Sequence, residues 1–281
     1  SLLGMAQNLV PNPDFESFVQ CPTMPMYCPF VNNGLQPTAT SWFSALSTTT
    51  DYYNSCAANL QYEVPNNIFY GFIPPHSGNG CAGIVAYAEF NGGTPQNSYR
   101  EYLECKLTQP LSAGTTYKLS VWVRSLYRQI LQPGVNFQAV AKLEANLSPT
   151  ALTSIVSPLS APAIALQKPA GGFITDTAWV QLTTTYTAAG GEEYLTIGTF
   201  NDPNNTRPAT MHLFPSPANS TADFTCYYLV DDVRLAELGA CDTTIAVHHS
   251  TFCSEDELEL TSAFTGDTYF WNTGATSPQH T

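Results

Sequence analysis

Two acidic segments, far apart in the sequence, constrain the fold of this chain most. The first, NLVPNPDFE, covers residues 8–16, and the second, CYYLVDDVRL, covers residues 226–235. Each places carboxylates beside an apolar run typical of a β-strand. We interpret them as the first and last strands of one β-sandwich, which are usually neighbours in a jelly roll. The pair therefore predicts an all-β domain with oxygen ligands left where its two ends meet.

Further strand patterns support this fold class. In residues 117–124, apolar side chains alternate with polar ones and Trp122, the period of a strand with one buried face. Two more strand-like runs, 179–188 and 194–200, flank Gly190 and Gly191, which predicts an antiparallel pair joined by a glycine turn. Helical periodicity is scarce, so the sequence predicts a jelly-roll β-sandwich.

Composition limits the partners. Hydrophobic residues make up 43% of the 281 residues, enough for a large core, whereas charged residues make up only 11%, well below the usual quarter. The net charge of −13 would repel phosphate backbones and anionic lipid surfaces, which argues against nucleic-acid and direct membrane partners. The excess of acidic residues favours cations such as calcium, which prefers clustered carboxylate and carbonyl oxygens.

Eight cysteines and no CxxC pair favour disulfides in an oxidising compartment over a zinc or redox site. Nearness in sequence suggests the pair Cys241–Cys253, and Cys105–Cys226 is expected if their strands are neighbours. The pairing of the other four cysteines stays open: Cys21, Cys28, Cys56 and Cys81.

Three regions are expected along the chain. Residues 1–7 resemble the end of a signal peptide with cleavage after Ala6, or form a flexible leader. Residues 8–238 form the jelly roll. Residues 239–281 hold too few strands to close a sandwich, so we expect the start of a truncated immunoglobulin-like domain in a longer protein.

The sharpest site prediction is a calcium ion where the two ends of the jelly roll meet. Asp14 and Glu16 alternate and would point to one side of an extended chain. Asp231 and Asp232 lie in an otherwise apolar strand, where a carboxylate needs a cation or hydrogen-bond donors. The alternative is that Asp14 forms an Asx turn and Asp232 is solvated.

A second prediction is sugar binding, since sugars need flat aromatic rings and hydrogen-bonding side chains. Trp122 and Arg124 lie on the face of their strand opposite the apolar residues, and Tyr87 and Tyr194 are candidates for a similar surface. The alternative places Trp122 in a second core, and for Trp179 a core position is favoured.

Catalysis has little support in the sequence. The five histidines form no HExxH motif, and there is no GxSxG elbow. His76 and Ser77 are adjacent, but a catalytic triad needs convergence in space. We therefore expect no enzyme activity.

Five segments, taken in order, resemble one known domain type: residues 8–16, 76–83, 99–103, 190–198 and 228–233. It is the N-terminal jelly-roll module, similar to carbohydrate-binding or galactose-binding-like domains, of cell-surface adhesins and gliding-associated proteins of the Bacteroidota. Residues 271–276 are similar to the immunoglobulin-like or PKD-like repeats that follow such modules. The resemblance implies export by the type IX secretion route and a structural calcium ligated by Glu16 and one of Asp231 or Asp232, with Asp14 and backbone carbonyls as further candidate ligands.

Together these observations predict a secreted, surface-displayed adhesion module that binds a glycan or surface polysaccharide and carries structural calcium. One alternative is a subunit or cap of a surface fibre that self-associates and binds no sugar. Another is the accessory module of a carbohydrate-active enzyme.

Overall fold

The computed structural model separates the chain into two compact units, residues 7–239 and residues 1–6 with 240–281. The residues described by the structure are 7–24, 26, 38–89, 98–126, 136–137, 139–140, 142–152, 159–200, 211–212, 224–238, 260–261 and 279–280. Within the smaller unit they comprise only the pairing of β16 (Leu260–Thr261) with β17 (Gln279–His280). Residues 1–6 of the expected leader and the rest of the expected immunoglobulin-like start lie outside the described residues, and both calls stay predictions.

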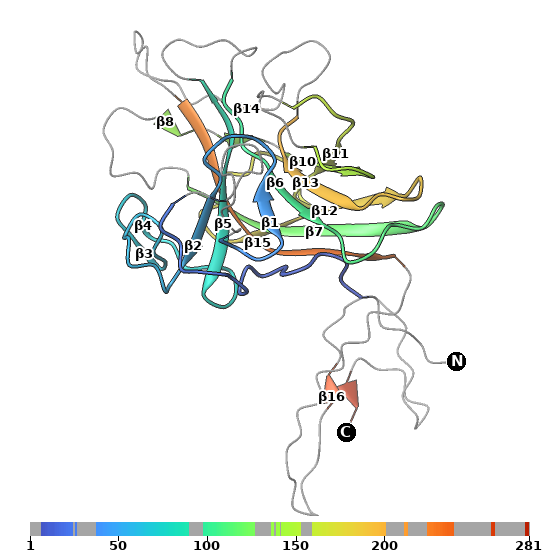
Figure 1. Ribbon diagram of the computed structural model, residues 1–281, viewed down its shortest axis with the longest axis horizontal. Helices are drawn as coiled ribbons and strands as arrows, with labels where there is room; N and C mark the ends of the chain where they lie inside the picture. Colours follow the sequence, from blue (N-terminus) through green and yellow to red (C-terminus); the bar gives the residue numbers. More distant parts are fainter. Residues whose placement is uncertain are drawn as a thin grey trace, which may run out of the picture. The chain divides into compact units, whose positions relative to one another are not determined.

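The larger unit is a sandwich of two β-sheets (Figure 1). One sheet has five strands, which in spatial order are β1 (Trp42–Ser44), β6 (Leu103–Lys106), β13 (Tyr194–Gly198), β10 (Leu143–Ser148) and β11 (Ile164–Leu166). The other has six: β12 (Val180–Thr187), β7 (Thr116–Ser125), β15 (Phe224–Glu237), β5 (Gly80–Glu89) and β2 (Asp51–Asn54), with β8 (Asn136–Phe137) parallel to β15. Two small pairings complete it, β3 (Asn66–Asn67) with β4 (Gly71–Phe72) and β9 (Ala139–Val140) with β14 (Met211–His212).

The described residues contain no helix, and the predicted all-β sandwich is confirmed. It follows that no described helix is long and apolar enough to span a lipid bilayer.

The main core lies between the two sheets. Leu103 and Cys105 of β6 belong to the same buried cluster as Leu119 and Val121 of β7. Because side chains alternate along a strand, burying Val121 leaves Trp122 on the outer face of the six-stranded sheet.

The two acidic segments lie side by side, as predicted. The Leu9 amide donates to the Leu235 carbonyl, at 2.8 Å, and the Val233 amide donates to the Pro13 carbonyl, at 2.9 Å. The first segment is nevertheless irregular and forms no ladder. Pro11 and Pro13 lack the N–H groups that a ladder needs.

The predicted pair of β12 and β13 is wrong. β12 pairs with β7 in one sheet, whereas β13 pairs with β6 and β10 in the other. Gly190 and Gly191 have φ values of 102° and 90°, a conformation that glycine adopts readily. Their turn carries the chain from one sheet to the other instead of folding it back.

Parts of both outer faces are covered by connecting segments. On the six-stranded sheet, Tyr53 and Leu229 pack with Val64 and Ile73 in a second buried cluster. On the five-stranded sheet, a third cluster includes Tyr102, Phe200 and Leu159, among other residues.

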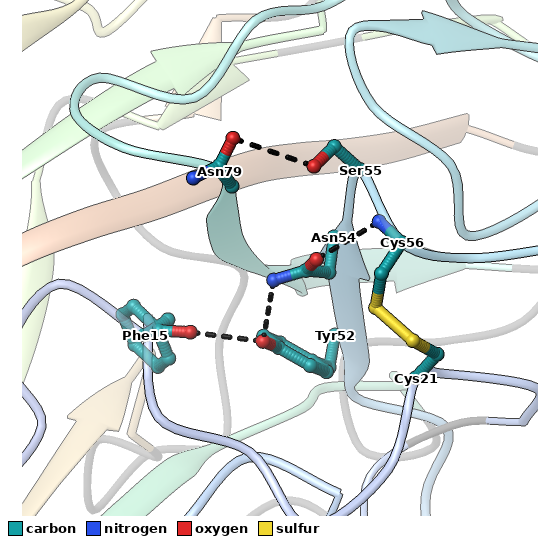
Figure 2. The surroundings of a disulfide bond; sticks show 7 residues. All are labelled: Phe15, Cys21, Tyr52, Asn54, Ser55, Cys56 and Asn79. Atoms are coloured by element: carbon teal, nitrogen blue, oxygen red, sulfur yellow. Dashed lines mark hydrogen bonds between the residues drawn. A yellow bond between two sulfur atoms is a disulfide. The ribbon is translucent and has the colours of Figure 1, made fainter.

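Among the described residues, one disulfide joins Cys21 to Cys56, with the Cα atoms 5.6 Å apart (Figure 2). It ties the N-terminal segment to the turn after β2. The expected Cys105–Cys226 bond is wrong, because β6 and β15 belong to different sheets, and both thiols are free and buried. Cys81 is also free and buried. Cys28, Cys241 and Cys253 lie outside the described residues.

Candidate functional site

A bulge in β15 shapes the site. The pairing of β15 with β7 shifts register between Asp231 and Arg234, and Asp232 has a φ of 44°. Consecutive side chains of a regular strand point to opposite faces. The bulge instead lets Asp231 and Asp232 bind the same loop, and such bulges are common beside functional sites.

That loop runs through residues 76–80 and ends at Gly80, the first residue of β5. Asp231 Oδ2 accepts the amides of His76 and Ser77, at 2.9 and 3.2 Å. Asp232 Oδ2 lies 2.5 Å from His76 Nδ1, and its Oδ1 accepts the Ser77 hydroxyl at 3.0 Å. Burial, with the nearby charge of Asp232, raises the pKa of Asp231 to about 8, although three backbone amides act in the opposite direction.

Glu16 holds the other end of the same loop. Its Oε1 accepts the amides of Asn79 and Gly80, at 2.6 and 2.7 Å, and its Oε2 accepts Asn79 Nδ2 at 3.3 Å. Asp14 lies outside this group, because its Oδ1 accepts the Glu16 amide at 3.4 Å, the Asx-type turn considered as the alternative. We call Glu16, Asp231 and Asp232 the acidic clasp.

The turn after β2 supports the same loop (Figure 2). The Ser55 amide donates to the Asn79 carbonyl at 3.0 Å, and the Ser55 hydroxyl donates to Asn79 Oδ1 at 3.4 Å. The next residue, Cys56, carries the disulfide. The loop is thus bound by the N-terminal segment, by β15 and by this turn.

Three of the four predicted calcium ligands, Glu16, Asp231 and Asp232, therefore gather around one loop, but they do not fit a calcium site. The clasp oxygens accept the loop's N–H and O–H groups. Among the described residues, no group of three or more His, Cys, Asp or Glu side chains is placed to hold a metal ion. Calcium binding itself stays a prediction.

Three aromatic side chains adjoin the clasp, and we call them the aromatic corner. The His76 ring stacks on Trp122, with centroids 4.0 Å apart and planes at 17°. It meets Trp179 edge-on at 5.8 Å, and Trp179 Nε1 donates to the Pro74 carbonyl. Both tryptophans are half-buried, while the side chains of His76 and Asp232 are 27% and 29% exposed. A ligand can therefore reach part of this corner.

The structure places the predicted sugar-binding residues in three different parts of the sandwich. Trp122 and Arg124 lie on the outer face of the six-stranded sheet, but Arg124 is buried and donates to the Phe72 carbonyl at 3.3 Å. Burial also lowers the Arg124 pKa. Tyr194 lies half-buried in the other sheet, with Lys106 Nζ 5.7 Å from its ring centroid. Tyr87 is fully buried in the main core, so its predicted surface role is wrong.

The arrangement of Ser77, His76 and Asp232 is not that of a catalytic triad. The serine hydroxyl and the imidazole both bind the carboxylate of Asp232. In a triad the serine binds the ring nitrogen opposite the one that faces the acid. The pattern fits positioning of the loop better than activation of a nucleophile.

Sequence reasoning missed an acid network around Asp51, a half-buried residue of β2 at the edge of the six-stranded sheet. Asp51 Oδ2 accepts the hydroxyls of Tyr227 and Tyr53, at 2.5 and 3.3 Å, and the two hydroxyls are 2.8 Å apart. Burial, followed by the charge of Glu101, raises the pKa of Asp51 to about 8. Burial likewise raises the pKa of Glu101. The only signal in the sequence is the spacing of Asp51 and Tyr53, which puts both on one face of a strand.

A further buried acid, Glu104, lies on the outer face of the five-stranded sheet. Its Oε1 accepts the Leu152 amide and the Thr196 hydroxyl, at 2.7 and 3.1 Å, and its Oε2 is buried without a partner in the described structure. Burial raises the Glu104 pKa to about 7. Glu104 is fully buried, so it cannot meet a large ligand.

No protein-family model matches the chain, and no curated protein matches it significantly. Among solved structures, it is 17% identical to the K3 cleaved adhesin domain of Lys-gingipain from Porphyromonas gingivalis, covering 83% of this chain and 98% of that one with a TM-score of 0.35. It is 13% identical to a putative sugar-binding protein of Bacteroides thetaiotaomicron, covering 83% and 100% with a TM-score of 0.36.

A third similar structure holds the CBM22-1 and GH10 modules of endo-1,4-β-D-xylanase 10B from Clostridium thermocellum, in complex with xylohexaose. Identity is 12%, the TM-score is 0.33, and the match covers 76% of this chain but only 27% of the xylanase chain.

Proposed function

We propose that this chain is a non-catalytic, extracellular binding module that recognises glycans at the aromatic corner. The observation that carries the proposal is the stacking of His76 on Trp122 with Trp179 at its edge, partly exposed beside Asp232. Aromatic rings offer flat apolar faces with a fixed geometry, which suit the C–H faces of sugars. The Asp232 carboxylate and the Ser77 hydroxyl supply hydrogen-bonding groups for sugar hydroxyls at the same place.

Two further features support the proposal. The Cys21–Cys56 disulfide is typical of proteins in oxidising compartments, such as the cell exterior. In addition, the acidic surface suits a neutral or cation-bridged polysaccharide better than a nucleic acid. A place within a type IX-secreted adhesin of the Bacteroidota belongs to the same proposal and rests on the sequence resemblance alone.

A glycan array tests the proposal. The wild-type chain is compared with Trp179→Ala and with Tyr194→Ala, which alters the half-buried tyrosine of the opposite sheet. We expect Trp179→Ala to abolish a specific hit that Tyr194→Ala retains, with both variants folded by circular dichroism.

The other results separate the alternatives. Loss of binding only in Tyr194→Ala would move the glycan site to the five-stranded sheet. Absence of any glycan hit, together with concentration-dependent assembly of the wild-type chain, would favour the structural fibre subunit.

A further inference from the structure

We infer that the acidic clasp holds the loop of residues 76–80 directly, without a metal ion, at the position where the sequence resemblance implies a structural calcium. The inference concerns how the fold is fastened and does not depend on glycan binding. It rests on hydrogen bonds among the described residues.

Hydrogen-bond donors of the protein already occupy the carboxylate oxygens of the clasp. Each of the two oxygens of Glu16, Asp231 and Asp232 lies within hydrogen-bond distance of a donor. Asp231 Oδ1, the one facing away from the loop, accepts the Asp232 amide at 2.8 Å. Calcium needs six to eight oxygen ligands directed at one point. Here the oxygens are instead distributed along the loop and around the bulge.

The loop of residues 76–80 presents backbone N–H groups to the clasp. Four of its amides, those of His76, Ser77, Asn79 and Gly80, point toward clasp carboxylates. Successive backbone N–H groups make a concave site that attracts anions. The loop therefore meets the carboxylates with the positive ends of its peptide dipoles, where a bridging cation would need carbonyl oxygens.

The loop approaches Glu16 closely at Gly78. Gly78 has a φ of 56°, and a Cβ atom there would overlap the Cδ and Oε1 atoms of Glu16. A real Cβ essentially never comes so near another heavy atom, so the glycine and the carboxylate are in direct contact. That contact leaves no space for an ion between them.

The clasp also positions the aromatic corner. Asp231 and Asp232 bind the His76 backbone and ring, and the ring lies on Trp122. Removing one carboxylate should therefore loosen the loop and the stacking together, whether or not metal is present.

The test is calorimetric melting of the wild-type chain, first shown to be metal-free by elemental analysis, in excess chelator and in excess calcium. We expect the same melting temperature in both. We also expect slow amide hydrogen exchange at His76, Ser77, Asn79 and Gly80 in chelator. Both measurements use the wild-type protein, so an unchanged melting temperature and slow exchange would support the inference without any variant.

Two variants test whether the clasp carboxylates stabilise the fold in the same way with and without calcium. Glu16→Gln and Asp231→Asn should melt lower by roughly 5 °C or more, given that ~1 kcal/mol shifts a domain of this size by a few degrees. The decrease should be the same in chelator and in calcium. The matched control is Glu193→Gln, which alters a surface ion pair with Lys106 and should change little.

A calcium-induced rise in the wild-type melting temperature that disappears in Glu16→Gln or Asp231→Asn would overturn the inference. A rise that persists in both variants would place a calcium site elsewhere in the chain and leave the inference standing.

Discussion

His76 and Asp232, separated by 156 residues in the sequence, meet through Nδ1 and Oδ2 at 2.5 Å. The contact joins the loop before β5 to a bulge in β15, and it holds the imidazole against Trp122. Residues expected to bind metal and a residue expected to bind sugar thus belong to one cluster. In that cluster the acids position the loop, and the aromatic side chains offer a surface.

Gly78→Ala should destabilise the fold strongly. A non-glycine residue in the left-handed region costs about 1–2 kcal/mol, and the new methyl group would also collide with the Glu16 carboxyl group. We expect a loss of roughly 2–4 kcal/mol in the free energy of unfolding, measured by urea titration.

Gly114→Ala is the matched control for this prediction. Gly114 has a φ of 77°, but nothing lies within 4 Å of the position that a Cβ atom would take there, so only the backbone strain of about 1–2 kcal/mol applies. Equal losses in the two variants would show that Gly78 does not contact Glu16 closely.

Reducing the Cys21–Cys56 disulfide should lower stability by about 4 kcal/mol, the loop-entropy value for residues 35 apart. The melting temperature with and without reductant measures the loss. The control is the double variant Cys21→Ser/Cys56→Ser, which should start lower and respond less to reductant. A full response in the double variant would assign the effect to other cysteines.

The strand over residues 117–124 was predictable because it needs only local alternation, whereas residues 8–16, predicted as the first strand, form no strand. The pattern around Val121 placed Trp122 on the outer face, and the two acidic segments indicated that the two ends of the jelly roll meet. Both features depend on periodicity and on residue types that the sequence displays directly.

The predictions that were wrong depended on irregularities within strands and on long-range strand pairing. Strict alternation puts Tyr87 on the same face as Val85, but β5 and β15 shift register between Cys226 and Tyr227, and this shift turns Tyr87 into the core. A second irregularity, at Asp232, gives two successive acids to one loop. Nothing local in the sequence marks either position.

Glu104 should make stability depend on pH. Burial raises its pKa in the folded chain from 4.5 to about 7, so its folded form holds a proton that the unfolded form releases. The protonated Glu104 therefore contributes up to ~3 kcal/mol to the free energy of unfolding. This contribution is complete below about pH 4.5 and is lost as the pH rises to about 7.

Glu104→Gln tests this dependence, because the amide stays neutral and its oxygen can still accept from Leu152 and Thr196. In urea titrations at several pH values, the variant should gain stability relative to the wild type between about pH 4.5 and 7. A difference that does not change with pH would contradict the raised pKa.

Tyr227→Phe should weaken the Asp51 network, and more so in alkaline solution. The Tyr227 hydroxyl donates to Asp51 at 2.5 Å and contacts the Tyr53 hydroxyl at 2.8 Å. Losing it should reduce the free energy of unfolding by about 1–3 kcal/mol. The Asp51 pKa, raised to about 8 by burial, should rise further, because the Tyr227 hydrogen bond favours the ionised form.

The sign of the pH effect follows from that raised pKa. Below about pH 4 Asp51 is protonated in both states, and its stabilising contribution is lost as the pH rises through about 8. At pH 9 the wild type keeps an ionised Asp51 with the Tyr227 donor, whereas the variant must ionise it with one donor fewer. The loss of unfolding free energy in Tyr227→Phe should therefore be larger at pH 9 than at pH 6.

The control is Tyr62→Phe, which alters a half-buried ring 6.4 Å from Tyr53. It should show a small loss that is equal at both pH values. A deficit of Tyr227→Phe that is equal at both would show that Asp51 does not depend on this hydroxyl when ionised.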